Sequence, residues 1–363
     1  MNILIFIVIL LVLVVSHEFG HFIVAKKFGI RVDEFSFGFP PTLFKKKVGE
    51  TTYKFNLLPF GGYVKIFGEN PNDESISGSE SGRSFSMKSR SVQSAVLLAG
   101  VVMNFLVAWL LLSVGFMTGL PSSSGQVPTG YTLQNESLVI TSIVSDSPAE
   151  KAGLTIGDKI TQLKSKSQIT ETPSPESVRY FIRQHGDESI EVSYTRGGEA
   201  KTATIIAESK DGSIPMIGIS MDVIGSLKLP VHTAILGGFK LAWHYTTATV
   251  VGFYTLAHDA ILGKADMSTI TGPIGIVGTV GDAASFGFIY LLSFTALISI
   301  NLAVINLIPF PALDGGRLLF LLIEKIKGSR IKPEIANMAN FIGFGLLMIL
   351  MLVITYHDVV KLF

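Results

Sequence analysis

Long apolar segments alternate with polar segments along the chain, and this alternation predicts a polytopic α-helical membrane protein with four transmembrane helices. Each apolar segment is long enough, at about 1.5 Å per residue, to cross a hydrocarbon core of about 30 Å. The four predicted spans are 2–25, 94–120, 288–307 and 336–356. A fifth apolar segment, 230–263, contains Lys240, His244, His258 and Asp259, so hydropathy alone does not decide whether it crosses the membrane.

The polar segment between the first two spans is rich in basic residues and in short apolar runs. It holds eleven Lys or Arg residues between Lys26 and Arg90, and basic loops stay cytoplasmic, so we expect the N-terminus outside. Aromatic and β-branched residues at 32–39 and 52–67 predict a β-hairpin region. Two interpretations of this region are open: it enters the membrane beside the first span, or it forms a small surface sheet.

The segment 121–225 has the composition of a soluble α+β domain. Strands are expected at 139–144, 190–194 and 202–207, and a helix at 177–184. The sequences SPAEKAGL at 147–154 and GDKI at 157–160 resemble a PDZ domain in the arrangement found in bacterial membrane and envelope proteases. Such a domain can add a peptide as an extra strand beside Ile217-Gly218-Ile219, or it can act as a steric gate.

Overall composition supports a membrane protein and narrows the available chemistry. The 363 residues are 48% hydrophobic and 16% charged, against about 25% charged in soluble domains. A net charge of +1 gives no case for a nucleic-acid partner. Because the chain has no cysteine, disulfides and thiolate zinc sites are excluded, and a metal site must use histidine and carboxylate ligands.

A metal-binding pattern lies in the first apolar segment. His17, Glu18 and His21 form HExxH, and on a helix the two histidines lie four residues apart on nearly one face, within reach of one tetrahedral Zn²⁺. The pattern can arise by chance. However, charged groups at membrane depth cost about 2.5–3.5 kcal/mol on insertion scales, and a metal is the partner that this spacing suits.

The third span ends in a sequence that cannot continue as a regular helix. Pro309 and Pro311 interrupt it, and irregular backbone at membrane depth is tolerated only beside protein or a water-filled cavity. Asp314, which is followed by two glycines, is the expected third zinc ligand. With the N-terminus outside, Asp314 reaches the cytoplasmic side where His17 and His21 lie only if 230–263 does not cross the membrane.

The number of membrane crossings before Asp314 determines the predicted domain organisation. The segment 226–287 is an interfacial helix and linker on the outer surface, and the C-terminus is also outside. The halves 1–120 and 288–363 form the catalytic membrane region, and 121–225 is the extracytoplasmic PDZ domain. In the second span, Gly100 lets another helix approach and Asn104 can hydrogen-bond across that contact, although simple packing explains both residues as well.

These motifs together resemble the site-2 protease family, specifically its regulator of sigma-E protease type. The resemblance rests on HEFGH, GFPP, NLLPFGGYVKIFGE, GVVMN, the PDZ signature, TGPIGI and NLIPFPALDGGRLLF, and it covers nearly the whole chain. It implies a zinc metalloendopeptidase of a bacterial inner membrane, with its active site near the cytoplasmic face. It also implies that His17, His21 and Asp314 bind zinc, that Glu18 is the catalytic base and that Asn306 binds substrate.

The expected partners are the lipid bilayer and transmembrane-helix substrates, such as pre-trimmed anti-sigma factors or remnant signal peptides. Relatives often carry two PDZ domains, whereas this chain has room for one. Two other classes of function remain as alternatives: a membrane scaffold with structural zinc, and an ion transporter. A structural zinc normally has four protein ligands, and transporters commonly have internal repeats, which this sequence does not show.

Overall fold

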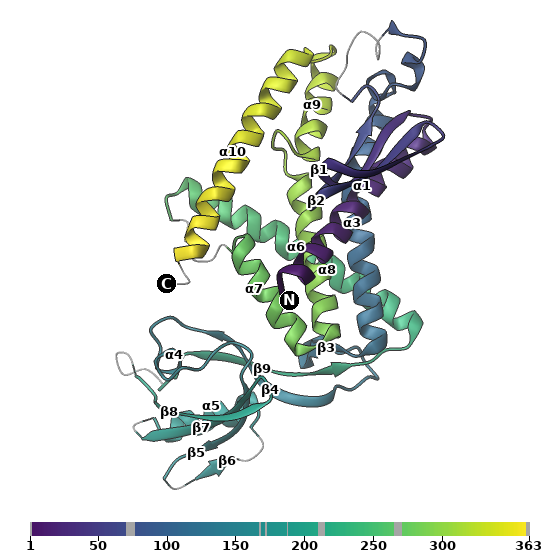
Figure 1. Ribbon diagram of the computed structural model, residues 1–363. Helices are drawn as coiled ribbons and strands as arrows, with labels where there is room; N and C mark the ends of the chain where they lie inside the picture. Colours follow the sequence, from purple (N-terminus) through teal and green to yellow (C-terminus); the bar gives the residue numbers. More distant parts are fainter. Residues whose placement is uncertain are drawn as a thin grey trace. The chain divides into compact units, whose positions relative to one another are not determined.

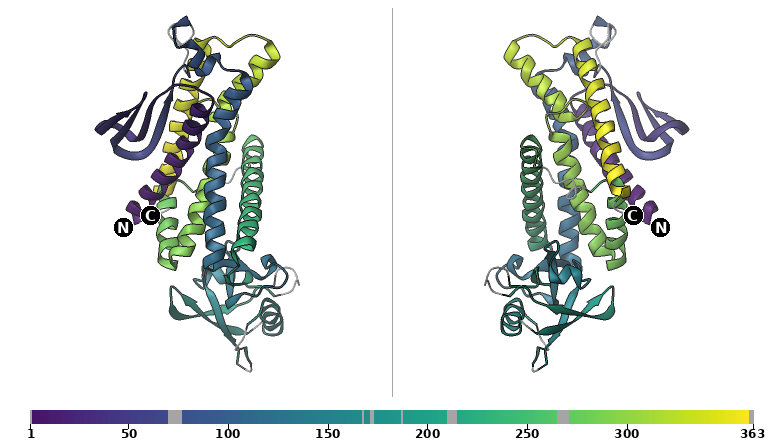
Figure 2. Two further views of the ribbon diagram at one scale, coloured as in Figure 1. Left: turned by 90° about the vertical axis from the view of Figure 1, so that its right-hand side faces the viewer. Right: turned by 90° about the vertical axis from the view of Figure 1, so that its left-hand side faces the viewer.

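The computed structural model describes residues 2–69, 77–166, 168–170, 173–186, 188–209, 215–264 and 271–360. The chain divides into two compact units (Figure 1 and Figure 2). The first contains Met1–Val114 and Ile235–Phe363, and the second contains Gly115–Ala234.

Among the described residues, four helices are long and apolar enough to cross a membrane, and they coincide with the four predicted spans. They are α1 (Asn2–Lys27), α3 (Arg90–Thr118), α8 (Phe288–Leu307) and α10 (Pro333–Val360). Only 6% to 39% of each apolar window is buried inside the protein, so most of their apolar surface is available to lipid.

The first unit is held together where α1, α3, α8 and the shorter α7 (Pro273–Phe286) meet. Ile9 and Leu13 of α1 are buried with Val280 of α7, and apolar residues of α3 and α8 pack around them. The hydroxyl of Ser299 on α8 donates a hydrogen bond of 2.8 Å to the backbone carbonyl of Asn104 on α3. Hydrogen bonds between apolar helices are favourable where no water competes for the groups.

The segment 226–287, expected to be an interfacial helix and linker on the outer surface, contains two helices: the long α6 (Val231–Ile261), and α7, which lies where linker was expected and packs on α1 and α8. The indole of Trp109 on α3 donates to the carbonyl of Ile235, and Thr249 donates to the side chain of Asn301 on α8 at 3.0 Å. Ile235 and Thr249 lie roughly 20 Å apart along α6, at about 1.5 Å per residue. The sequence did not predict that α6 packs along α3 and α8. The placement of α6 on a membrane surface stays a prediction.

The β-hairpin region is present and is longer than the sequence predicted. β1 (Val32–Val48) pairs antiparallel with β2 (Thr51–Ile66), and the register shifts around the Gly38-Phe39-Pro40-Pro41 sequence. Phe35 pairs with Tyr53 on one side and with Val64 on the other, so the two strands fold into a small sheet of four segments. The segment 62–66 pairs with the start of β1 and forms an edge of this sheet.

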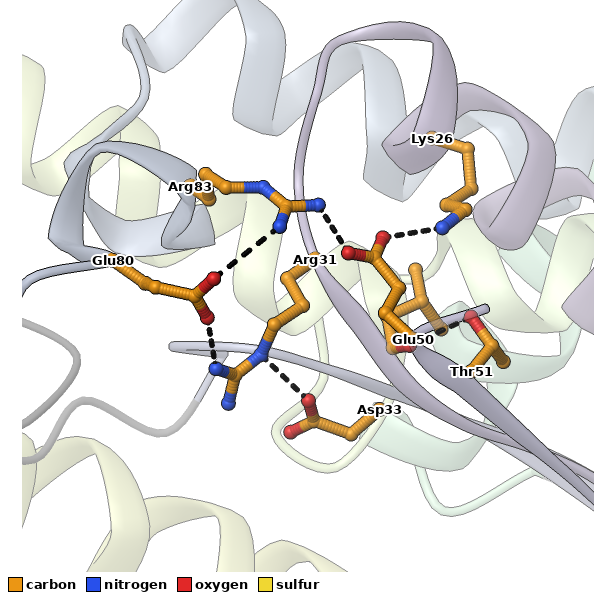
Figure 3. Close-up of polar contacts among 8 residues, drawn as sticks. Lys26, Arg31, Asp33, Glu50, Thr51, Glu80 and Arg83 are labelled. Atoms are coloured by element: carbon orange, nitrogen blue, oxygen red, sulfur yellow. Dashed lines mark hydrogen bonds and ion pairs between the residues drawn. The ribbon is translucent and has the colours of Figure 1, made fainter. Parts of the chain in front are cut away.

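A cluster of ion pairs fixes the base of the hairpin to the end of α1 (Figure 3). Glu50, in the β1–β2 turn, accepts hydrogen bonds from Lys26 of α1 and from Arg83. These two bonds hold the pKa of the Glu50 carboxyl below its usual value of 4.5. The cluster continues through Arg83 to Glu80, and from there through Arg31 to Asp33. The hairpin is therefore joined to the C-terminal end of α1.

Helix α9 (Asp314–Lys327) begins at the aspartate that the sequence predicted as a metal ligand. Leu318 and Leu321 of α9 pack on a buried cluster that includes Ala25 of α1, Val32 of β1 and Val96 of α3. Because one cluster contacts all four elements, the start of α9 is fixed against α1 and α3.

The second unit has the strand and helix pattern expected for the PDZ-like domain. Its sheet has the order β3-β9-β4-β5-β7-β8, with β6 paired to β5. The elements are β3 (Leu120–Ser123), β4 (Gln134–Ile143), α4 (Pro148–Lys151), β5 (Lys159–Lys164), β6 (Ile169–Thr170), α5 (Pro175–Gln184), β7 (Ser189–Arg196), β8 (Glu199–Ile206) and β9 (Ile219–Leu227). A short 3₁₀ turn lies at Ser124–Gln126, and the first unit has two such turns, at Ser81–Arg83 and Phe85–Met87.

Asp158 of the GDKI sequence has a structural role in this unit. Its side chain is fully buried, accepts the backbone N–H of Thr155 at 2.8 Å, and pairs in a bidentate manner with Arg196 at 2.6 and 2.7 Å. A buried carboxylate is stable when paired in this way. The motif therefore joins the start of β5 to the end of β7.

Candidate metal centre

Three side chains from the two halves of the chain meet at one point. His17 and His21 lie on consecutive turns of α1, and Asp314 is the first residue of α9. The Nε2 atoms of the two histidines are 3.2 Å apart, and they lie 3.1 and 3.2 Å from Asp314 Oδ2. Ligands bonded to a tetrahedral zinc at about 2.0–2.1 Å are separated from one another by about 3.3–3.4 Å. The three atoms therefore have the spacing that this metal requires, within a few tenths of an ångström.

The loop between α8 and α9 delivers Asp314 to this point. Its prolines end α8 at Leu307, and the loop folds back so that the N–H of Phe310 bonds to the carbonyl of Ile308 at 2.7 Å. A Cβ atom on Gly315 would lie 2.3 Å from the backbone oxygens of Leu307 and Ile308. Only glycine permits this approach. Gly315 therefore allows the backbone approach that places Asp314 at this point, and Asp314 supplies the carboxylate.

Gly100 of α3 provides the space for the two imidazole rings. A Cβ atom there would lie 2.4 Å from His21 Nε2 and 2.6 Å from His17 Cε1. The rings are enclosed between α1 and α3, and both histidines are buried, with 7% and 5% of their surface exposed. The small residue recognised in the sequence therefore makes room for the two histidines, which the sequence alone did not indicate.

Glu18 lies beside the centre and contacts the hairpin. Its Oε2 accepts the backbone N–H of Val64 at 2.9 Å. This N–H makes no hydrogen bond within the sheet, because Val64 lies in the edge segment and its N–H points toward α1. A backbone donor carries no side-chain signature, so no sequence pattern could have predicted this contact.

The remaining predicted site residues are placed as follows. Asn306 is half-buried in the last turn of α8, next to the loop that leads to Asp314. In the second unit, β3 pairs only with Ile224–Leu227 of β9, which leaves the preceding part of β9 as a strand edge among the described residues. This edge follows directly from Ile217-Gly218, the expected groove strand.

Comparison with known proteins decides the family. The model of peptidase family M50 matches residues 5–350. The chain belongs to peptidase family M50, the site-2 proteases. As an M50 member it is a zinc metalloprotease, and with its four apolar helices it is a multi-pass membrane protein. The resemblance seen in the motifs is thereby confirmed.

Relatives of this M50 peptidase match over the whole chain. A protein of Clostridium acetobutylicum is 34% identical over 99% of this chain and 97% of its own length. The zinc metalloprotease RasP of Geobacillus kaustophilus is 30% identical over 100% of this chain and 98% of its own. The regulator of sigma-W protease RasP of Bacillus subtilis is 27% identical over 99% and 98%. A solved PDZ domain of an SdrC-like protein from Listeria monocytogenes is 24% identical and covers 25% of this chain and 92% of that one, with a TM-score of 0.20.

Proposed function

We propose that this M50 peptidase hydrolyses peptide bonds inside the transmembrane segments of single-span membrane proteins, with His17, His21 and Asp314 as its zinc ligands. The observation that supports the proposal is the convergence of these three ligand atoms within 3.2 Å of one another, on elements nearly 300 residues apart in sequence. A structural zinc would need a fourth protein ligand, and the cluster among the described residues offers three. The fourth position is then available to water, which favours a catalytic role.

Glu18 is the general base of the proposed mechanism. Zinc held by the three ligands would polarise the scissile carbonyl and lower the pKa of water to about 7. The Glu18 carboxylate takes the proton of the attacking water, and it then donates this proton to the departing amine. The bond from Val64 holds one carboxylate oxygen, so the side chain is oriented before substrate arrives. Asn306, at the end of α8, binds the substrate beside this centre.

The substrate must be extended at the point of cleavage, because the amides of an intact helix are hydrogen-bonded to one another and shielded. The hairpin offers a surface for this extended form. Its segment 62–66 is a sheet edge adjacent to Glu18. The backbone groups of this edge other than the Val64 N–H, which Glu18 accepts, can pair with a substrate strand. We expect strand addition to this edge to place the scissile bond near the metal centre.

The hairpin also has an apolar, exposed side that fits association with the membrane. Leu43, Phe44, Phe55 and Leu57 are each more than half exposed, and Phe44 pairs with Phe55 across the strands. Exposed apolar patches of this kind are uncommon on surfaces that contact only water. Of the two interpretations that the sequence left open, this pattern favours insertion beside the catalytic helix.

Orientation and substrate class complete the proposal. We infer that both termini and the PDZ-like unit are extracytoplasmic in a bacterial inner membrane, because the basic loop after α1 stays cytoplasmic. The name of the Bacillus subtilis relative, a regulator of sigma-W protease, supports a pre-trimmed anti-sigma factor as substrate, with remnant signal peptides as the second class. The edge of β9 would bind a peptide, or the unit would act as a steric gate.

The test compares wild type with Glu18→Gln in detergent, using a model single-span substrate. Wild type should bind one zinc and cleave, and Glu18→Gln should bind one zinc and not cleave, because the carboxamide cannot take a proton. Glu136→Gln, at an exposed position in the second unit, is the matched control and should behave as wild type. Cleavage by Glu18→Gln would overturn the assignment of the base, and a wild type that binds no zinc would overturn the metal site.

A further inference from the structure

Asn104 is a buried polar side chain in the apolar helix α3, and it lies against the first histidine. It is completely buried, and its carboxamide nitrogen is placed 3.4 Å from His17 Nδ1. Its Oδ1 is one of two buried side-chain polar atoms without a hydrogen-bond partner among the described residues, the other being Asn56 Oδ1. A buried carbonyl oxygen without a donor costs about 1–3 kcal/mol, so this oxygen calls for an explanation.

The tautomer of His17 supplies the missing donor. The Nε2 atom of His17 is the one that faces His21 and Asp314, so it is the atom available to a metal. An imidazole that binds a metal through Nε2 carries its proton on Nδ1, and that N–H must donate to an acceptor. The group next to Nδ1 is the carboxamide of Asn104, whose nitrogen cannot accept this bond.

Rotating the Asn104 carboxamide by half a turn accounts for both the unpaired Oδ1 and the Nδ1–H of His17 that needs an acceptor. The oxygen and nitrogen of an amide side chain have nearly the same shape, so their assignment follows from the hydrogen bonds that they make. With Oδ1 turned toward His17, the orphaned oxygen gains a donor and the Nδ1–H gains an acceptor. His21 already has the corresponding arrangement, because its Nδ1–H donates to the backbone carbonyl of Val96 at 2.8 Å.

We propose that Asn104 is a positioning residue of the metal centre: its side-chain oxygen accepts the Nδ1–H of His17 and fixes the ring with Nε2 directed at the metal. The two histidines then have different supports from the same helix, a backbone carbonyl for His21 and a side chain for His17. Only the second can be removed by substitution. This inference rests on the proposed metal site, and it assigns one of the two explanations that the sequence left open for Asn104.

The test measures zinc affinity by chelator competition in the purified full-length protein. Asn104→Leu keeps the branched shape and the number of heavy atoms of the side chain and removes the acceptor. We expect zinc affinity to fall by about 10–100-fold, as for other supporting residues of metal ligands. Asn104→Asp keeps an acceptor and should bind zinc within a few-fold of wild type. Ser299→Ala is the matched control, because it removes only the bond to the Asn104 backbone. It should leave zinc affinity unchanged.

A double-mutant cycle shows whether Asn104 acts through His17. In a His17→Ala background the Nδ1–H is absent, so Asn104→Leu should cause no further loss of the residual zinc affinity. An additive loss there would overturn the proposal, as would unchanged zinc affinity in Asn104→Leu alone. A loss in Asn104→Asp equal to that in Asn104→Leu would also overturn it, because it would mean that the carboxamide nitrogen is the group required. If wild type itself binds no zinc, the proposed function fails, which is a separate result.

Discussion

Replacing Gly100 with alanine tests how closely α3 approaches the metal centre. The added Cβ would lie 2.4 Å from His21 Nε2 and 2.8 Å from His17 Nε2. Ordinary van der Waals contact of a Cβ atom at such a position begins at 3.4 Å. One or both rings must therefore move by about 0.6–1.0 Å, or the two helices must separate by a similar distance.

The size of this movement sets the expected effect. A displacement of about 1 Å at a reacting centre lowers the rate by about 100-fold. Both displaced atoms are proposed zinc ligands, so zinc affinity should fall as well, by at least about tenfold. Helix stability points the other way, because alanine favours a helix by about 0.8–1.0 kcal/mol over glycine. A loss of activity in Gly100→Ala could not then be attributed to a weaker α3.

The assay measures cleavage of a model single-span substrate and zinc affinity by chelator competition, with Gly345→Ala as the control. Gly345 lies in α10 and has nothing within 4 Å of an added Cβ, so the same substitution there should change neither quantity. The reasoning is refuted if Gly100→Ala binds zinc and cleaves as wild type does. It is also refuted if both alanine variants lose activity equally, since the effect would not then depend on the close approach.

Three further predictions concern the ligands, the base and the hairpin. Asp314→Ala should lower zinc affinity by more than about 100-fold, since loss of a ligand exceeds loss of its support; stoichiometric zinc at nanomolar free metal would place the third ligand elsewhere. Val64→Pro removes the N–H that bonds to Glu18 but removes no hydrogen bond of the sheet. Cleavage should therefore fall by about tenfold while zinc is retained. Unchanged cleavage would show that this bond does not orient Glu18. Glu50 has a lowered pKa, so its contribution to stability is present above about pH 4.5 and is lost as pH falls through its folded pKa. Thermal melts should therefore show a smaller loss between pH 6 and pH 3 in Glu50→Gln than in wild type, and equal losses would contradict this.

The sequence predicted those parts of the protein that depend on periodicity or on side-chain chemistry. Hydropathy located the four long apolar helices found among the described residues, because crossing a membrane requires a minimum length of apolar chain. The HExxH spacing and the proline-interrupted segment before Asp314 indicated side chains that the structure brings within 3.2 Å of one another. Both signals are local, and each follows from helix geometry or from the restrictions that proline imposes.

The parts that the sequence did not predict depend on contacts between distant segments. The bond from Val64 to Glu18 uses a backbone group, and so does the bond from His21 to Val96. Asn104 was recognised as a polar residue in an apolar helix, but its neighbour could be identified only when α3 was placed against α1. The packing of α6 along α3 and α8 depends on Trp109 and Asn301, which no repeating pattern distinguishes.

Cleavage inside a membrane segment is the central claim, and mapping the cut site tests it most directly. Wild-type protein reconstituted in liposomes would be given a substrate with one transmembrane helix and short polar flanks, and the products would be identified by mass spectrometry. We predict a cut within the apolar segment, toward its cytoplasmic end, which a zinc chelator abolishes and added zinc restores. Cuts confined to the polar flanks, or cleavage that continues with the chelator present, would contradict the account.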